Sequence, residues 1–97
     1  MRAVHPGEVL KDELGVTPTG FARQIDVPPN RISQIVAGKR AVTGDTALRF
    51  GRWFGAEPQF WLNLQSAYEI RIAEEKAGRE TARLPVRTGR DRASTRR

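Results

Sequence analysis

Proline stands at the beginning of four stretches in which apolar residues recur every three or four positions. Each of these prolines suits a first helical position, because the N–H that proline lacks would have no partner inside the helix there. They are Pro6, Pro18, Pro29 and Pro58. A fifth stretch has the same spacing and lies between Thr43, which can cap a helix, and Gly55. No stretch alternates apolar and polar residues for long enough to indicate a strand, so the sequence predicts an all-α fold of five short helices.

The second and third stretches together have the spacing of a helix-turn-helix, from Phe21 to Gly38. Two helices that cross closely need a small residue where they touch, and Ala22 supplies it. The turn needs a positive φ, and Asp26 stands there instead of the usual glycine, since a short polar side chain visits that region more readily than most. Gly38 lies where a left-handed helix end needs glycine. We expect the motif's second helix to be anchored to the core by Val27, Ile32 and Ile35.

The polar residues in the first half of that second helix are left facing outward. Asn and Gln pair with adenine, Arg with guanine and Ser with either base in the major groove of DNA. We therefore expect base contacts from Asn30, Arg31, Ser33 and Gln34. Hydroxyl and basic residues at the ends of the two helices suit the phosphate backbone, and these are Thr17, Thr19, Lys39 and Arg40. The alternative is that residues 30–34 are only the solvated face of an amphipathic helix; the whole set, with its turn and basic exit, favours DNA.

The charge of the chain follows this organisation. The formal net charge is +6. Residues 23–52 carry six basic against two acidic residues, whereas residues 57–76 carry two basic against four acidic ones. Basic clusters that follow one structural unit are typical of nucleic-acid binding. Charge alone fits a solvated surface equally well.

The helical pattern ends after Gly78. From Arg79 onward, seven Arg stand against two acidic residues, and Leu84 and Val86 are the only sizeable apolar side chains. Such a segment buries too little surface to offset the entropy of ordering it. The sequence therefore predicts two parts, a DNA-binding and dimerisation domain over 1–78 and a flexible, Arg-rich tail over 79–97. The tail can add phosphate contacts, contact a protein partner or only aid solubility; we favour phosphate contacts.

The fifth stretch has more apolar surface than one core-facing stripe needs. Phe60, Leu64 and Ala67 share one face, which we expect to be the inward one. Large aromatic residues outside such a stripe often mark an interface. We expect a dimer interface built from Trp53, Trp61, Leu62 and Tyr68. The alternative is that a small domain uses every aromatic residue in its core. A dimer would suit DNA half-sites about 34 Å apart.

Several classes of site and location are excluded or disfavoured by the sequence. The chain has no cysteine and one histidine, His5, so neither disulfides nor a multi-histidine metal site is expected. His5 has no partner at a catalytic spacing and is expected to cap a helix or lie at the surface. No phosphate-binding glycine loop or nucleophile motif is present, so we expect neither an enzyme nor a cofactor. Without a signal peptide or membrane-spanning run, the expected location is the cytoplasm.

Three further runs join the helix-turn-helix in a pattern that resembles a known family. They read HPGE at 5–8, GKRAVTGDTA at 38–47 and PQFWLNLQ at 58–65. Together they resemble the HigA-type antitoxins, a branch of the Xre-like helix-turn-helix proteins with a lambda-repressor-like fold, over about residues 4–71. The resemblance implies the antitoxin of a bacterial type II toxin–antitoxin system. Such a protein neutralises a RelE-like ribonuclease toxin and represses its own operon by binding a palindromic operator as a homodimer.

The resemblance also assigns residues by position. It implies base contacts by Asn30, Arg31 and Gln34, and it adds Thr43 to the expected backbone contacts. Pro18 stands where the family often has Gln, so the motif's first helix lacks one polar backbone contact. When bound to DNA, a protein of this kind is associated with the nucleoid. The alternatives are a stand-alone Xre-like repressor without a toxin and a helical protein-binding adaptor that does not bind DNA.

Overall fold

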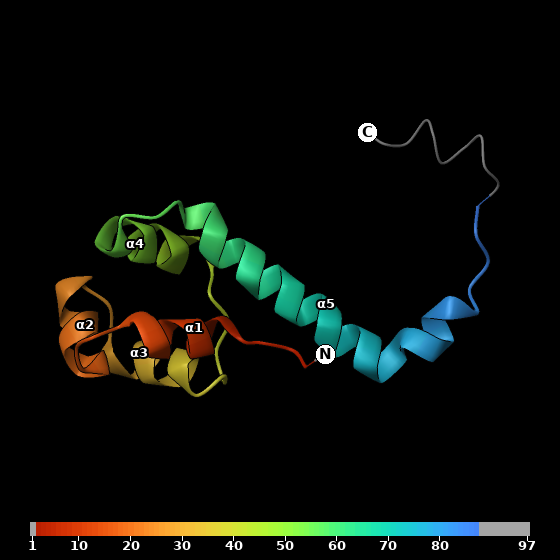
Figure 1. Cartoon of the computed structure of the whole chain (residues 1–97), viewed down its shortest axis with the longest axis horizontal. Helices are drawn as coiled ribbons and strands as arrows, with labels where there is room; N and C mark the ends of the chain where they lie inside the picture. Colours follow the sequence, from red (N-terminus) through yellow and green to blue (C-terminus); the bar gives the residue numbers. More distant parts are fainter. Residues whose placement is uncertain (1, 88–97) are drawn as a thin grey trace.

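The computed structural model describes residues 2–87; residues 1 and 88–97 lie outside the described part. That part contains five helices and no strand, which confirms the all-α prediction. The helices are α1 (Pro6–Glu13), α2 (Pro18–Gln24), α3 (Pro29–Val36), α4 (Gly44–Phe54) and α5 (Pro58–Ala82). Helices α1 to α4 form one group, and α5 begins beside α4 and projects away from it (Figure 1). None of the described helices has the length and apolar character needed to cross a bilayer.

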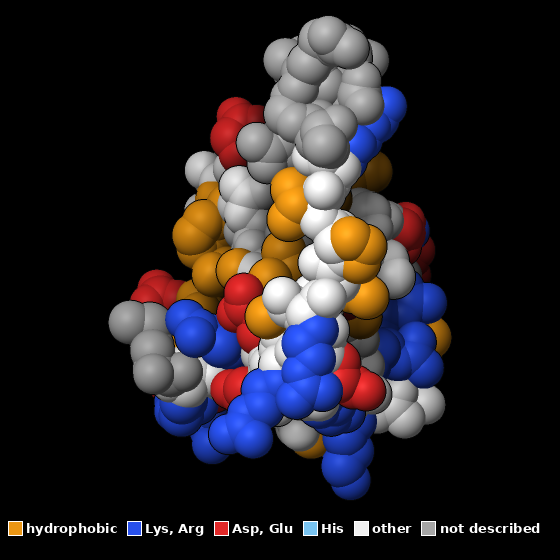
Figure 2. All heavy atoms as spheres, turned by 90° about the vertical axis from the view of Figure 1, so that its right-hand side faces the viewer, with side chains coloured by type: hydrophobic (Ala, Val, Ile, Leu, Met, Phe, Trp, Pro, Cys, Tyr) orange, Lys and Arg blue, Asp and Glu red, His pale blue; other side chains and the backbone are white. Residues whose placement is uncertain are grey.

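Helix α5 is longer than the sequence pattern predicts. It continues through Gly78 to Ala82, so the predicted helix end near residue 78 falls four residues short of the observed one. The division into a domain and a tail stays a prediction. A glycine inside a helix lowers its stability by about 1 kcal/mol relative to alanine, and α5 continues past Gly78 despite this cost. Figure 2 looks onto the end toward which α5 projects and shows apolar side chains in its upper and middle part, with many Lys and Arg side chains below them. The part of the tail at 88–97, predicted to be flexible, lies outside the described residues.

Side chains cap the first two helices. The Nδ1 atom of His5 accepts a hydrogen bond from the Gly7 N–H at 2.9 Å, and the Glu8 carboxylate accepts one from the His5 N–H at 3.3 Å. The predicted capping role of His5 is therefore confirmed. The Thr17 hydroxyl accepts from the Gly20 N–H at 3.0 Å, as its place before Pro18 predicts. Such caps satisfy N–H groups that have no partner inside the helix.

Residues with positive φ lie at the predicted turns. Asp26 has a φ of 61°, and it is the one residue other than glycine with a positive φ in the described part of the chain. Gly38 and Gly55 have φ values of 76° and 72° where α3 and α4 end, which confirms their predicted places. These three turns fix where α2, α3 and α4 stop.

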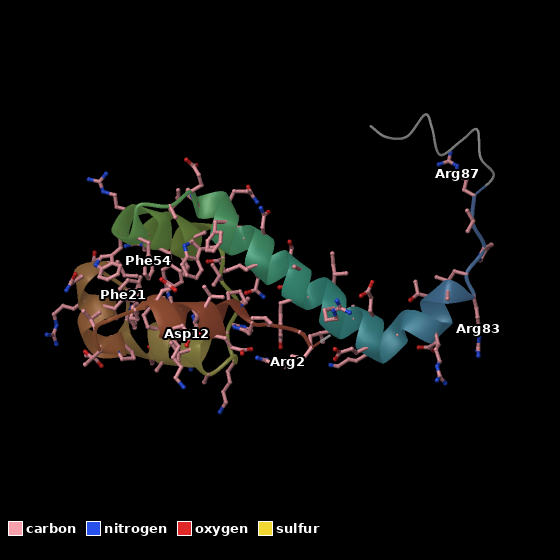
Figure 3. All side chains as sticks on the ribbon, in the orientation of Figure 1. Arg2, Asp12, Phe21, Phe54, Arg83 and Arg87 are labelled. Atoms are coloured by element: carbon pink, nitrogen blue, oxygen red, sulfur yellow. The ribbon has the colours of Figure 1, made fainter. Side chains whose placement is uncertain are left out.

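The core lies between α1–α3 on one side and α4 with the first turns of α5 on the other. Its aromatic part joins Phe21 of α2 to Phe50 and Phe54 of α4, with ring centroids 5.5 and 5.7 Å apart. Phe21 and Phe54 point toward each other across this boundary (Figure 3). Trp61 of α5 completes the cluster at 5.0 Å from Phe50 and is 2 % exposed.

The inward face of α5 differs from the predicted one. Trp61 and Gln65 are buried, whereas Phe60 is 46 % exposed and Ala67 is also exposed. The prediction that Phe60, Leu64 and Ala67 form the inward face is wrong for Phe60 and Ala67, whereas Leu64 is half-buried and packs against the core. The physical reason is Gln65, which is buried with a hydrogen bond from the Val42 N–H to its side-chain oxygen at 2.8 Å. A pattern that counts only apolar residues does not detect a polar residue that is satisfied in the core.

Candidate nucleic-acid interface

The helix-turn-helix has the predicted packing. Ala22 is fully buried where α2 meets α3, and Ile32 and Ile35 hold α3 to the core with no exposed surface. The turn is closed by a hydrogen bond from the Val27 N–H to the Ala22 carbonyl at 3.0 Å. With one face of α3 fixed inward, the polar residues of its first half are left at the surface.

The four predicted base-contacting residues lie on that surface and differ in how far their side chains are exposed. Asn30 and Ser33 are exposed, and the Ser33 hydroxyl donates to the Asn30 carbonyl at 3.2 Å. Arg31 and Gln34 are half-buried against neighbouring side chains. The Gln34 side-chain oxygen accepts from Nε of Arg40 at 2.8 Å, which leaves the two amide N–H donors of Gln34 for another partner. The side chain of Arg31 keeps 28 % of its surface exposed and lies beside Asp45 of α4.

The predicted backbone-contacting residues form two groups. Arg40 and Thr43 line one hollow together with Arg31, next to the first turn of α4, and Lys39 is exposed just before them. Thr17 and Thr19 are exposed at the start of α2, and Thr17 lines a separate hollow with Lys11 and Val36. Their roles on DNA stay predictions. Thr43 precedes α4 as expected, although its hydroxyl lies 3.3 Å from the Thr46 hydroxyl and caps no backbone N–H.

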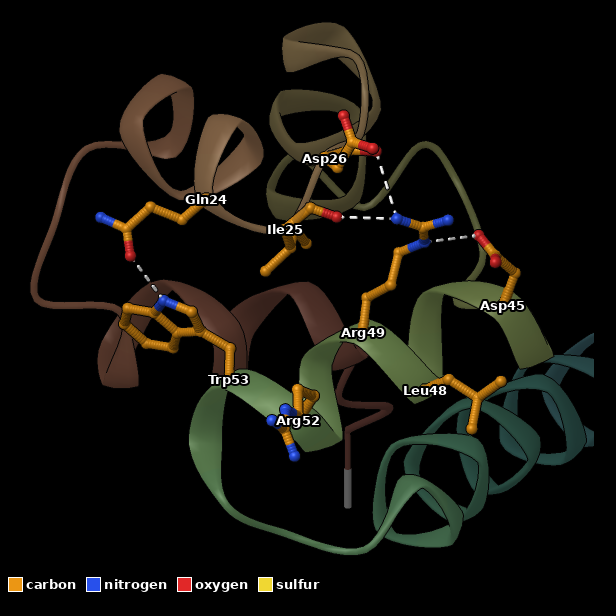
Figure 4. Close-up of a pocket in the computed structure, with 8 residues that line it drawn as sticks. All are labelled: Gln24, Ile25, Asp26, Asp45, Leu48, Arg49, Arg52 and Trp53. Atoms are coloured by element: carbon orange, nitrogen blue, oxygen red, sulfur yellow. Dashed lines mark hydrogen bonds and ion pairs between the residues drawn. The ribbon is translucent and has the colours of Figure 1, made fainter.

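Two charged residues of α4 belong to this surface and were missed in the sequence. Asp45 lies beside Arg31, and Arg49 lies beside Asp45, with Oδ2 of Asp45 3.5 Å from Nη1 of Arg31 and 3.1 Å from Nε of Arg49. Arg49 also donates to the backbone carbonyls of Ile25 and Asp26 at 2.8 and 3.2 Å (Figure 4). Opposite charges four residues apart on one helix were the available signal.

The predicted dimer residues do not form one exposed patch. Trp61 is buried in the core of its own subunit, so the prediction that it is left over from the core is wrong. Trp53 is half-buried, donates to the Gln24 side-chain oxygen at 2.8 Å and packs its ring edgewise against Phe21 at 4.9 Å. Leu62 and Tyr68 are half-buried on α5, and the Tyr68 ring lies 4.8 Å from that of His5. The most exposed apolar residues of α5 that sequence reasoning did not single out for an interface are Phe60 and Ile70.

Two further observations concern metal-ion binding and His5. The described residues contain no group of three or more His, Asp or Glu side chains that could hold a metal ion. His5 is buried against α5, and this burial lowers its pKa from the usual value. The Nδ1 atom of its ring is engaged in capping α1.

Comparison with known proteins places this geometry among DNA-binding relatives. No family model matches the chain. Virulence-associated protein I of Dichelobacter nodosus is 40 % identical over 92 residues, which cover 91 % of this chain and 85 % of that protein. The structure of an addiction module antidote protein of a HigA family from Coxiella burnetii superposes with a TM-score of 0.88 at 41 % identity, covering 91 % of this chain and 100 % of that one. Antitoxin HigA of Pseudomonas aeruginosa, solved with the higBA promoter, gives a TM-score of 0.82 at 35 % identity over 87 % of this chain and 97 % of that one.

Proposed function

The chain belongs to the HigA family of helix-turn-helix antitoxins, and from this premise we propose that it binds the operator of its own operon as a homodimer and represses it. One observation carries the proposal. The polar first half of α3 lies at the surface, exposed or half-buried, beside a hollow lined by Arg31 and Arg40, in a fold shared with an antitoxin solved together with promoter DNA.

The geometry supports a definite division of labour on DNA. Helix α3 lies in the major groove, where Arg31 contacts a guanine edge and the amide N–H groups of Gln34 contact an acceptor on a neighbouring base. Arg40 and Lys39 follow α3 and hold the phosphate backbone, which fixes the register of the helix. Thr17 accepts a backbone N–H with its hydroxyl oxygen, so its O–H is left to donate to a phosphate.

We propose that the DNA-binding unit is a dimer of two copies of the chain. Helix α5 offers half-buried Leu62 and Tyr68, and Ile70 is 60 % exposed further along the same helix. Exposed apolar residues on a projecting helix are typical of an interface, and two copies are what a palindromic operator requires. We place the dimer contact on α5, with Trp53 of α4 as a further contact.

The toxin partner is proposed on family membership alone. A HigA-type antitoxin neutralises a RelE-like ribonuclease toxin by binding it, and this role involves no catalysis by the antitoxin. Such a protein acts in the cytoplasm, on the nucleoid when it is bound to DNA. Co-expression with the neighbouring gene tests this part, because a true pair co-purifies and the antitoxin restores growth. Absence of a toxin gene beside this one favours the stand-alone repressor.

DNA reading is tested by replacing Arg31 or Gln34 with alanine. Each change removes a base contact, so the affinity for the chain's own upstream DNA should fall by about 1–3 kcal/mol, while the affinity for random DNA changes far less. Fluorescence anisotropy with both duplexes at one salt concentration measures the two losses. Arg79→Ala, which removes one positive charge from the exposed end of α5, is the matched control and should leave the preference unchanged.

Two outcomes would contradict this assignment. Equal losses on specific and random DNA would show that Arg31 and Gln34 contact only phosphates. A wild-type protein without preference for its upstream DNA in excess competitor would instead support the protein-binding adaptor.

A further inference from the structure

A carboxylate lies in the middle of the proposed DNA-contacting surface. Asp45 is in the first turn of α4, and a single oxygen, Oδ2, contacts Arg31 at 3.5 Å and Arg49 at 3.1 Å. Asp45 also lines the hollow that Arg31 shares with Arg40 and Thr43. A negative charge at this place repels phosphates and opposes the electrostatic attraction on which DNA binding depends. Its position is therefore unfavourable for affinity as such.

Arg49 fixes this carboxylate to the turn of the helix-turn-helix. Its Nη1 atom donates to the carbonyl of Ile25 at 2.8 Å and to that of Asp26 at 3.2 Å, while its Nε atom donates to Asp45 (Figure 4). A guanidinium is planar, so three contacts in different directions leave it little freedom to turn. Asp45 is thus held relative to the same turn that positions α3.

The carboxylate that Arg49 fixes is in turn the partner of Arg31. Its contact with Asp45 uses Nη1, and a guanidinium has five N–H donors in all. A guanine edge, which presents the neutral acceptors O6 and N7, takes two of the remaining donors and leaves the contact with Asp45 in place. A phosphate that approaches Arg31 brings its own negative charge against the Asp45 carboxylate. The arrangement favours a base partner over a phosphate partner.

We propose that Asp45, held by Arg49, is a specificity-determining residue that orients Arg31 toward a base edge and opposes its capture by phosphates of any sequence. The inference rests on the proposed function, because it requires α3 to face base pairs. It deepens that function by assigning part of the sequence preference to two residues of α4 that need not touch a base themselves.

The test compares the affinity for upstream DNA with that for a random duplex of equal length at one salt concentration. Asp45→Asn should raise the affinity for random DNA about two- to fivefold, as expected for release of an exposed ion pair, and should not raise that for upstream DNA. The ratio of the affinity for upstream DNA to that for random DNA therefore falls. Arg49→Lys keeps every charge but cannot hold two carbonyls and a carboxylate at once, so it should lower the ratio as well.

Asp26→Asn is the matched control for charge. Asp26 lines the same hollow as Asp45 and Arg49, its carboxylate forms no ion pair among the described residues, and asparagine tolerates its positive φ. This variant should strengthen binding to both duplexes alike and keep the ratio. Thermal unfolding followed by circular dichroism, with binding measured well below each Tm, separates loss of preference from loss of fold.

A double variant shows whether Asp45 acts through Arg31. In an Arg31→Ala background, Asp45→Asn should leave the ratio where Arg31→Ala alone puts it. The inference is overturned if Asp45→Asn and Arg49→Lys keep the wild-type ratio, or if Asp45→Asn lowers it equally without Arg31. A wild type without any preference refutes the proposed function itself, which distinguishes the two failures.

Discussion

The amide of Gln65 is buried between α5 and the segment that enters α4. Its oxygen accepts from the Val42 N–H at 2.8 Å, and its nitrogen donates to the Glu69 carboxylate at 2.9 Å. A buried amide without partners would cost about 1–3 kcal/mol, so both contacts are needed for this side chain to face inward. Gln65 and Trp61, one turn apart, therefore set the orientation of α5 against the core.

His5 makes the stability of the fold depend on pH. Its Nδ1 atom accepts from the Gly7 N–H and so carries no proton, and burial lowers the pKa of His5 against a weaker opposing attraction from Glu8. The ring also faces Tyr68 of α5. The unfolded chain therefore takes up this proton more readily than the folded one. The stabilisation is complete above the ordinary pKa of 6.5 and is lost as the pH falls below it.

Urea unfolding between pH 7.5 and 5 should show this loss, with a slope of at most about 1.4 kcal/mol per pH unit, the limit for one proton. His5→Asn keeps a side-chain acceptor at the helix cap without a titrating ring, so its slope in this window should be smaller. The Glu8 carboxylate does not interfere, because hydrogen bonds from Arg2 and then from the His5 backbone hold its pKa below 4.5. An equal slope in wild type and variant would assign the pH dependence to other groups.

Gly7 allows α1 and α3 to approach each other closely. A methyl group at this position would overlap the carbonyl oxygen of Ile35 in α3. Gly7→Ala should therefore lower the free energy of unfolding by about 3 kcal/mol, since backbone atoms must move to make room. Gly44→Ala, at the start of α4 with no atom within 4 Å of the new methyl group, is the control and should be neutral or slightly stabilising. Similar losses in both variants would refute the close approach.

At the scale of the helices, the starts and turns could be predicted because local residues determine them. Pro18 after Thr17 marks the start of α2, and Asp26 has the positive φ expected of a short polar residue at the turn. Such signals act over a few residues and do not depend on the rest of the fold. The inward face of α5 could not be predicted in this way, because it depends on what Gln65 meets across the core.

The candidate site was predictable to a similar extent. The outward position of Asn30 and Ser33 follows from the inward position of Ile32 and Ile35 by helical periodicity. The pairing of Arg31 with Asp45 joins residues fourteen positions apart, on two helices whose packing the sequence pattern does not specify. The end of α5 was also missed, because a single glycine weakens a helix without ending it.

At the scale of the whole molecule, the residues of the core and the arginines at 88–97 belong to different parts of the sequence. The buried apolar core ends at Trp61, whereas residues 88–97 carry four Arg and one Asp. Removal of residues 88–97 should leave the Tm almost unchanged. If these arginines contact phosphates, the plot of log affinity against log salt concentration should become shallower, because a protein with fewer phosphate contacts releases fewer counterions when it binds. An unchanged slope would show that these residues take no part in DNA binding.

Helix α5 runs from Pro58 to Ala82, over 25 residues in all, with Trp61 buried in the core near its start. At 1.5 Å per residue its path is about 37 Å long, so a tilt of about 5° at its base moves its tip by up to about 3 Å. In a dimer joined along α5, such a tilt would link the angle between the two copies to the distance between their α3 helices. A protein bound to the C-terminal ends of α5 would change the fit of the dimer to an operator without contacting the DNA-binding surface.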